Sequence, residues 1–182
     1  MVPVEIHSEP QGREDAIIEV AAKAFAPVEG PDNAARIALL VRDLLDKTPA
    51  EDRVIMVAET TDGPIGLCGF SRLRYAGDTR TAFVMGPVAV AETHQRQGVG
   101  RVLIEDGLRK MRAMGVDVIL VYGDPDYYGA FGFEPVSEAF APAPYPLQHP
   151  HGWQARFLSD ASRTPLAGDA TCVPAFADPE LW

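Results

Sequence analysis

Two closely spaced glycines, Gly98 and Gly100, follow an apolar run at residues 83–90 and open a segment with apolar residues at helical spacing. This order predicts a strand, a short polar turn and an amphipathic helix over residues 98–114. The first N–H groups of a helix have no intrahelical partner and lie at the positive end of its dipole, so such a turn suits a phosphate group. Because glycine has no Cβ, the backbone can approach such a ligand closely.

The spacing excludes two commoner phosphate-binding loops. A P-loop needs Gly-Lys-Ser/Thr, whereas Arg101 and Val102 follow the second glycine here. A Rossmann turn needs a third glycine at the position that Leu103 occupies. The pattern Q/R-x-x-G-x-G/A does match, as Gln95, Arg96, Gln97, Gly98, Val99 and Gly100. This hexapeptide resembles motif A of the GNAT acetyltransferase superfamily, and taken alone it also fits a plain glycine-rich turn between a strand and a helix.

A second motif lies downstream, after one more predicted strand. Residues 128–133 have the pattern Y-x-x-x-G-F, which begins at Tyr128 and ends at Gly132 and Phe133. It resembles motif B of the same superfamily, in the right order and at the right distance. From the two motifs together, the chain is identified as a GNAT member, with the sharpest resemblance over residues 84–135. One domain over residues 1–182 is expected, with a less family-like segment at 141–182.

The resemblance implies a set of functional residues. Backbone amides near Gln97, Gly98 and Gly100 would hold the pyrophosphate of acetyl-CoA, and the strand end would pair with its pantetheine and polarise the thioester carbonyl through one N–H. Tyr128 matches the family's general acid, which would protonate the departing thiolate. The predicted cofactor-binding residues are Val88, Ala89, Val90, Gln95, Arg96, Gln97, Gly98, Val99, Gly100 and Arg101. A charge from Arg96 or Arg101 would strengthen phosphate binding, although a solvated arginine explains either residue nearly as well.

The resemblance leaves the general base open. Glu59 and Glu92 are weak candidates, and surface charge explains both of them better. Three positions depart from the family pattern. Glu92 replaces a frequent proline, Val121 an asparagine that binds CoA in some members, and Asp124 an alanine; Asp124 is expected to cap a short helix that Pro125 begins.

The expected activity is direct, acetyl-CoA-dependent N-acetylation of a primary amine on a small molecule or peptide. A catalytically idle acyl-CoA-binding or regulatory module on the same fold is the alternative, and an O-acyl or succinyl transferase would differ only in its cleft. A covalent acetyl-enzyme is not expected, because neither Cys68 nor Cys172 lies in a motif beside a base. Cys68, in an apolar strand, is expected to be buried and inert.

Composition bears on the class of protein, its partners and its compartment. The 182 residues carry a formal charge of −10, with 47% hydrophobic and 23% charged residues, and contain no Lys/Arg run. These values indicate a globular domain, disfavour nucleic acid as a partner and mildly favour a cationic amine. No signal peptide or membrane span is recognisable, so a cytoplasmic protein is expected, with a homodimer left open. His149 and His151 lack a third ligand, so no metal is expected.

The pattern of apolar residues and breakers predicts an α+β fold: a mixed, mostly antiparallel sheet with helices on both faces, in three layers. The two N-terminal helices are predicted at residues 11–26, ended by Pro27, and at 33–47. The strands are predicted at residues 2–6, 54–58, 65–73, 81–90, 116–122, 133–140, 153–158 and 171–173.

Overall fold

The structure of the protein is a computed structural model that describes residues 3–160 and 162–182. The chain forms two compact units. Unit 1 contains the chain up to Phe70 together with Pro87–Lys110, and unit 2 contains Ser71–Gly86 and Met111–Trp182. Two strands, β3 (Gly63–Tyr75) and β4 (Ala82–Val90), and helix α2 (Val99–Ala113) each contribute residues to both units.

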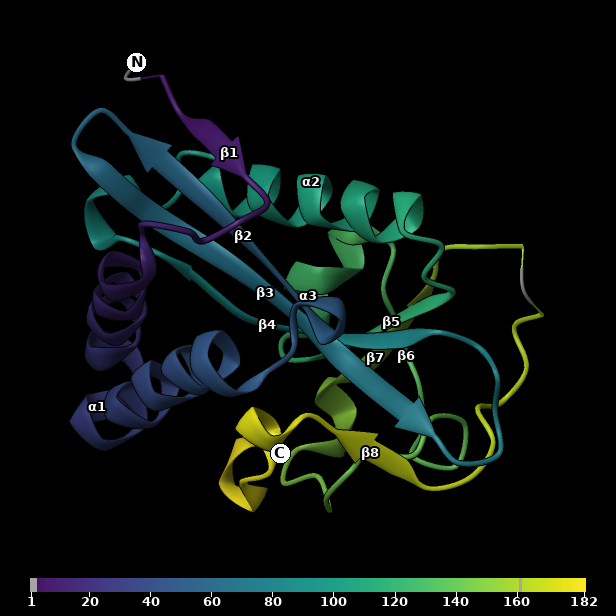
Figure 1. Ribbon diagram of the computed structural model, residues 1–182. Coiled ribbons are helices and arrows are strands. Elements are labelled where there is room, and N and C mark those ends of the chain that lie inside the picture. The colour runs from purple at the N-terminus through teal and green to yellow at the C-terminus, as the bar shows by residue number, and fades with distance from the viewer. Residues whose placement is uncertain (1–2, 161) are drawn as a thin grey trace. The chain divides into compact units, whose positions relative to one another are not determined.

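In unit 1, β1 (Glu5–His7) pairs antiparallel with β2 (Arg53–Thr60), and β2 neighbours β3. Residues 54–58 of β2 and 65–70 of β3 are buried without alternation. Continuous burial means that both faces of these strands are covered. Figure 1 shows the covering helices, α1 (Glu14–Lys47) and α2, on opposite sides of the strands. Val2, predicted to begin the first strand, lies outside the described residues.

Helix α1 is two helices joined at a kink, as predicted, but the break is not at Pro27. Gly30 has φ 84° and ψ 169°, which no helical residue adopts, whereas Pro27 lies inside the first helix. A proline costs the helix one hydrogen bond, and less than one further turn follows it before the glycine. Pro31 then stands at the start of the second helix, where its fixed φ is favourable. The first helix also begins later than predicted, at Glu14.

Helix α2 closely matches its prediction, with its apolar stripe buried. It packs tightly on β3: a Cβ added at Gly107 would come within 2.4 Å of the Phe70 ring. Its C-terminus is a Schellman motif, because Gly115 has φ 78° and Val116 N–H donates to the Met111 carbonyl at 3.1 Å.

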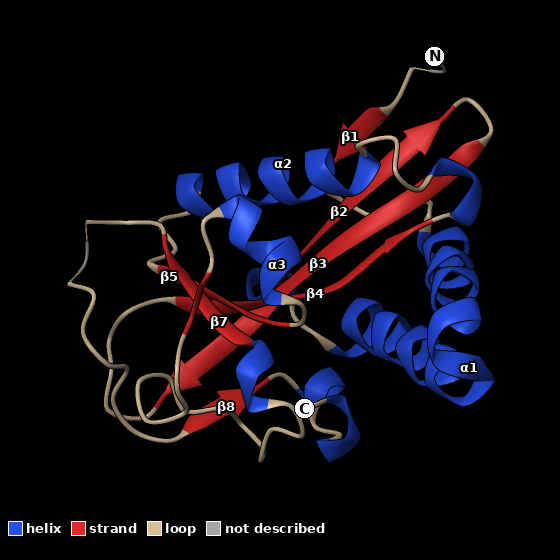
Figure 2. Ribbon diagram, turned by 180° about the vertical axis from the view of Figure 1, so that it is seen from behind, coloured by secondary structure: helices blue, strands red, loops and turns tan. Residues whose placement is uncertain are grey.

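Unit 2 contains the remaining strands together with parts of β3 and β4. These strands neighbour one another in the order β8, β3, β4, β5, β7, β6. The remaining strands are β5 (Val118–Tyr122), β6 (Glu134–Pro135), β7 (Trp153–Phe157) and β8 (Ala170–Cys172). β4 and β5 pair in parallel, whereas the β5–β7, β6–β7 and β3–β8 pairs are antiparallel. The predicted mixed, mostly antiparallel α+β sheet is therefore confirmed; Figure 2 shows β8 beside the end of β3.

The strand predicted at residues 133–140 is wrong beyond its first few residues. Only Glu134–Pro135 forms a strand, because Pro135 has no N–H to donate and the chain turns at Ser137. The Ser137 hydroxyl accepts from Phe140 N–H at 3.1 Å, and the Ser137 carbonyl accepts from Ala141 N–H at 2.9 Å.

The C-terminal segment belongs to the core of unit 2. Trp182 is 2% exposed and packs against Trp153 and Phe176. Both indole N–H groups are satisfied, since Trp182 donates to the Phe176 carbonyl at 3.0 Å and Trp153 to the Ala141 carbonyl at 2.7 Å. The last residues of the chain therefore complete a hydrophobic cluster in unit 2.

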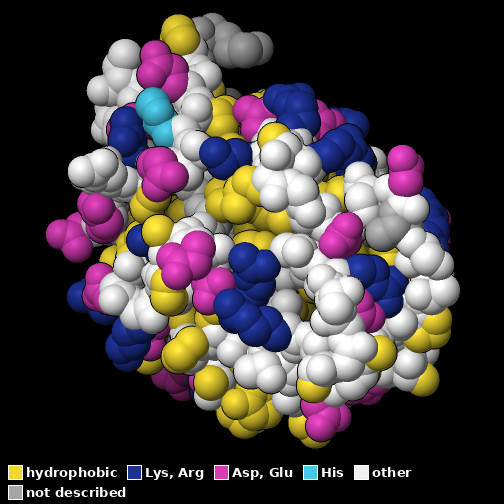
Figure 3. All heavy atoms as spheres, turned by 45° about the vertical axis from the view of Figure 1, so that its right-hand side comes forward, with side chains coloured by type: hydrophobic (Ala, Val, Ile, Leu, Met, Phe, Trp, Pro, Cys, Tyr) yellow, Lys and Arg dark blue, Asp and Glu magenta, His cyan; other side chains and the backbone are white. Residues whose placement is uncertain are grey.

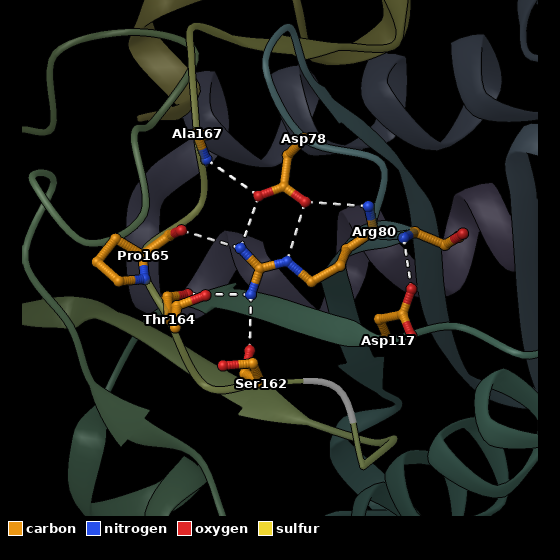
Figure 4. A network of polar contacts seen from close by, with 8 residues as sticks. Asp78, Arg80, Asp117, Ser162, Thr164, Pro165 and Ala167 are labelled. Atoms are coloured by element: carbon orange, nitrogen blue, oxygen red, sulfur yellow. Dashed lines mark hydrogen bonds and ion pairs between the residues drawn. The ribbon is translucent and has the colours of Figure 1, made fainter.

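An ion pair between Asp78 and Arg80 also holds a distant part of unit 2 (Figure 4). The Arg80 guanidinium donates to the carbonyls of Ser162, Thr164 and Pro165 at 2.9, 3.0 and 2.9 Å. These contacts fix a segment without regular secondary structure to the turn between β3 and β4. We call the two side chains the Asp78–Arg80 clamp.

Candidate functional site

The strand end predicted to receive pantetheine lies just after a break in β4. The parallel register of β4 with β5 runs from Ala82–Val118 to Met85–Val121 and, in the part of the chain that the structure describes, goes no further. Gly86 then has φ 152°, which favours glycine, and Pro87 has no N–H. These two residues mark where regular pairing stops.

Beyond the break, the residues of the strand end differ in burial. Ala89 is buried, whereas Val88 and Val90 are half-buried. The next residue, Ala91, donates its N–H to the Ile65 carbonyl at 2.7 Å, which ties this end of β4 to β3. The three predicted pantetheine-binding residues therefore stand on a strand that is held at its end within unit 1.

The glycine turn is built from side chains that bond to backbone. The Gln95 Nε2 group donates to the Val90 carbonyl at 2.9 Å, and Gln97 Nε2 donates to the Thr93 carbonyl at 2.9 Å. Arg96 has φ 59° and Gly98 has φ 87°, both in the left-handed region. The two left-handed residues turn the chain from the strand end into the start of α2.

The first turn of α2 is open to solvent at its N-terminus. Gly98 is exposed, and a Cβ built there would meet nothing within 4 Å. The Gly98 carbonyl accepts the Val102 N–H at 3.0 Å, so the N–H groups that precede Val102 have no partner further back in the helix. Arg101 lies in this turn, but its Nε donates to Glu105 Oε1 at 2.8 Å. The backbone N–H groups therefore give this turn positive character, and the charge of Arg101 is shared with Glu105.

Tyr128 is the last residue of the short helix α3 (Pro125–Tyr128) in unit 2. Asp124 caps this helix as predicted, because its carboxylate accepts from Asp126 N–H at 2.9 Å. The Tyr128 ring lies against the backbone of Gly123, where an added Cβ would come within 2.6 Å of its Cε2 atom. No role is predicted for Gly123 from the sequence; its position between a predicted buried strand and a predicted helix cap is the one signal that points to it.

The rest of the second motif packs against the same ring. Gly132 has φ 79° and ends the turn that follows α3, which directs Phe133 into the core. Phe133 packs edge-on against Tyr128, with ring centroids 6.1 Å apart. Tyr127 also packs edge-on against Tyr128, at 5.0 Å, and is 44% exposed. Phe133 of the Y-x-x-x-G-F pattern and the neighbouring Tyr127 therefore both pack against the Tyr128 ring.

Glu59 is engaged in structure and is a poor general base. Its carboxylate accepts from Arg13 Nε at 2.8 Å and lies 3.0 Å from His7 Nε2. The hydrogen bond from Arg13 is the main reason that the pKa of Glu59 is lowered. Glu92, the other weak candidate, is exposed in the turn after β4.

The two cysteines differ in environment. Cys68 is fully buried on β3, and burial raises the pKa of its thiol well above the usual range, so it is inert at neutral pH as predicted. Cys172 is half-buried on β8, and burial also raises its pKa. His149 and His151 are exposed neighbours with ring centroids 5.9 Å apart. Within the described residues, no group of three potential ligands could hold a metal ion.

Figure 3 shows one face of the molecule, on which acidic and basic side chains are interspersed. Within residues 3–160 and 162–182, no helix is long and apolar enough to cross a bilayer.

Comparison with known proteins identifies the family. The profile of the acetyltransferase (GNAT) domain matches residues 51–135. The chain is 31% identical over 169 residues to the uncharacterized N-acetyltransferase YjhQ of Escherichia coli K12, and this alignment covers 90% of this chain and 87% of YjhQ. It is 35% identical over 80 residues to the uncharacterized N-acetyltransferase YhbS of the same organism, which covers 43% of this chain and 48% of YhbS.

Solved structures agree on the fold. The E. coli YhbS structure in complex with CoA matches with a TM-score of 0.77 at 22% identity, over 98% of this chain and 94% of that one. A GNAT acetyltransferase of Brucella melitensis in complex with acetyl-CoA matches with a TM-score of 0.76 at 24% identity, over 97% and 99%. The motifs, the mixed sheet and these matches agree, and the chain belongs to the GNAT family of N-acetyltransferases.

Proposed function

We propose that this protein binds acetyl-CoA at the start of α2 and transfers the acetyl group directly to a primary amine. The exposed glycine turn is the feature that supports the proposal most directly, because its backbone N–H groups suit a pyrophosphate. Two structural neighbours are complexes with CoA and acetyl-CoA. The acceptor would be a small molecule or a peptide, and the acidic chain, with net charge −10, favours a cationic one.

The turn has the chemistry that a pyrophosphate needs. Amides near Gln97, Gly98 and Gly100 would donate to the phosphate oxygens, and the α2 dipole would add favourable potential. The first turn of α2 contains no carboxylate that would repel an anion. Gln95 and Gln97 would act through the backbone, since each amide already holds a carbonyl of the same segment.

Two further groups would serve the transfer itself. An N–H of Val88, Ala89 or Val90 would donate to the thioester carbonyl as negative charge develops on its oxygen. The amine nitrogen would attack that carbon, and Tyr128 would give its phenolic proton to the departing sulfur. Such acid assistance contributes about 10²–10⁴ in rate. Removal of the amine proton is assigned to no side chain, because Glu59 is held by Arg13 and His7.

The proposal is tested by measuring thiol release from acetyl-CoA against a panel of primary amines. We expect amine-dependent release with sequential kinetics, and Tyr128→Phe should lower kcat by about 10²–10⁴ with acetyl-CoA affinity almost unchanged. Tyr127→Phe is the matched control, since it removes a hydroxyl from the adjacent ring, which is 44% exposed, and keeps that ring's packing. Saturable binding of acetyl-CoA without turnover of any amine would instead support an idle binding module, and no binding at all would refute both.

A further inference from the structure

A cavity of about 400 Å³ lies at the edge of the sheet in unit 2. Strand β6 is only two residues long and pairs with β7 at Gln154 and Ala155, which leaves the edge of β7 at Arg156 and Phe157 uncovered by β6. Gly132, Ser137 and Phe140 also line the cavity. Cavities of roughly 300–1,000 Å³ are the size that holds small organic ligands.

The position of this cavity along the sheet follows from the register of β7 with β5. On β7, Trp153 lies opposite Tyr122 at the end of β5, whereas Phe157 lies opposite Val118 at its beginning. Four residues of strand span about 13 Å. The β7 residues of the cavity therefore stand near the start of β5, away from its Tyr122 end.

The cavity wall contains a partly buried cation without a counter-charge. Arg156 donates to the Phe131 carbonyl, and no carboxylate pairs with it among the described residues. Burial lowers the pKa of this guanidinium, and the nearby Arg112 lowers it further. An arginine stays protonated in such a site, and because no carboxylate forms an ion pair with it, an anion would be stabilised beside it.

A second arginine is brought to the same cavity by the Asp78–Arg80 clamp. Arg163 lies in the cavity wall, over the ring of Phe157 at 6.0 Å from its centroid. Its neighbours Ser162 and Thr164 are the residues whose carbonyls Arg80 holds (Figure 4). The backbone on both sides of Arg163 is thus fixed, which reduces the entropy lost when its side chain binds a ligand.

The other walls favour an apolar body next to the anion. The rings of Phe140 and Phe157 stand nearly perpendicular, with centroids 6.2 Å apart. The Ser137 hydroxyl accepts from Phe140 N–H and keeps its own proton to donate. Glu134 also lines the cavity, and its negative charge disfavours a ligand with more than one negative charge.

We propose that this cavity is a binding site for a small monocarboxylate with an aromatic or aliphatic body, held by Arg156 and Arg163 and packed against Phe140 and Phe157. The carboxylate accepts from the two guanidinium groups, and the apolar body covers the rings. None of these four residues has a role in the acetyl transfer proposed above, so this proposal does not depend on it.

The test uses the ¹⁵N-labelled full-length chain, titrated with benzoate, phenylacetate and hexanoate at constant ionic strength while amide shifts are followed. We expect at least one acid to shift the Arg156 and Phe157 amides saturably, and its neutral amide to bind at least tenfold more weakly. Arg163→Gln should weaken binding by about threefold to tenfold, and Arg156→Gln by about tenfold or more. Arg109→Gln, on the exposed face of α2, is the charge-matched control and should bind like wild type.

Three results would overturn the proposal: no saturable shift with any of the three acids, equal affinity for an acid and its amide, or wild-type affinity in Arg163→Gln. Arg156 also bonds to the Phe131 carbonyl, so its variant could unfold. Arg163 is exposed and has only the ring contact within the described residues, so the Arg163→Gln result decides the matter if Arg156→Gln does not fold.

Discussion

Replacing Gly123 by alanine is expected to slow acetyl transfer without touching the proposed acid. The new Cβ would stand 2.6 Å from Tyr128 Cε2 and 3.3 Å from Cδ2. To restore ordinary contact at 3.4 Å, the ring must move by about 0.8 Å. Tyr127 and Phe133 pack against the ring and oppose that movement. A displacement near 1 Å can cost about 10²-fold in rate, so we expect kcat to fall by about that factor.

The matched control is Gly129→Ala, at the residue after Tyr128. Gly129 has helical φ and ψ of −56° and −32°, and an added Cβ there meets nothing within 4 Å. This variant should keep wild-type activity and gain up to about 1 kcal/mol in stability through the unfolded state. Gly123→Ala should instead lose about 1–3 kcal/mol from overpacking.

The assay is steady-state thiol release, combined with urea unfolding to separate activity from folding. If Gly123→Ala acts by displacing the phenol, its effect should largely vanish in a Tyr128→Phe background, because the acid is already absent. Two results would refute this reasoning: full activity of Gly123→Ala, or a double variant that loses the product of both single losses. The second would mean that Gly123 acts elsewhere.

Three other predictions concern binding, mechanism and stability. Gly98→Val should abolish acetyl-CoA binding in calorimetry, because the side chain fills the open turn and the left-handed backbone at φ 87° costs a non-glycine residue roughly 1–2 kcal/mol. Gln95→Ala should weaken binding modestly, and near-normal affinity of Gly98→Val would contradict the assignment of the turn as the pyrophosphate site. A Cys68→Ala/Cys172→Ala variant should remain active, and intact-mass detection of a covalent acetyl adduct on the wild type would refute direct transfer. Asp78→Asn should lower the free energy of unfolding at pH 7 by about 1–3 kcal/mol. Hydrogen bonds from Arg80 hold the pKa of Asp78 well below its usual range. The ionised Asp78 therefore stabilises the folded state above about pH 4, and this contribution is lost as the pH falls further. In acid unfolding, the free energy of unfolding of Asp78→Asn should depend less on pH in that range than that of the wild type.

Local signals in the chain predicted the elements that carry the two motifs. The start of α2 and the Asp124 cap each depend on residues within one helical turn, and the structure has both. The break at Gly30 was missed because two prolines and a glycine compete over five residues, and only the observed φ decides between them. The strand at residues 133–140 failed because the Ser137 turn overrides an apolar pattern.

Contacts between distant residues could not be predicted from spacing. Arg80 reaches carbonyls 82 to 85 residues away, and nothing near Ser162 or Pro165 in the sequence indicates a guanidinium partner. The position of Tyr128 against Gly123 is likewise a contact across a helix cap. The family resemblance supplied the proposed role of Tyr128, whereas the residues that orient its ring became visible only in the structure.

The hydrogen bond of Gln95 gives a physical reason for the first position of the glycine motif. That position takes Gln or Arg, which differ in charge but share terminal N–H donors. Here the Gln95 amide donates to the Val90 carbonyl, five residues back, and so closes a loop between the strand end and the phosphate turn. The position therefore favours a long side chain with a donor, and its charge is secondary. A glutamate of the same length could only accept, and it would repel both the Val90 carbonyl and a phosphate. This bond joins the strand end, whose N–H groups are proposed to serve the thioester, to the turn whose N–H groups are proposed to hold the pyrophosphate.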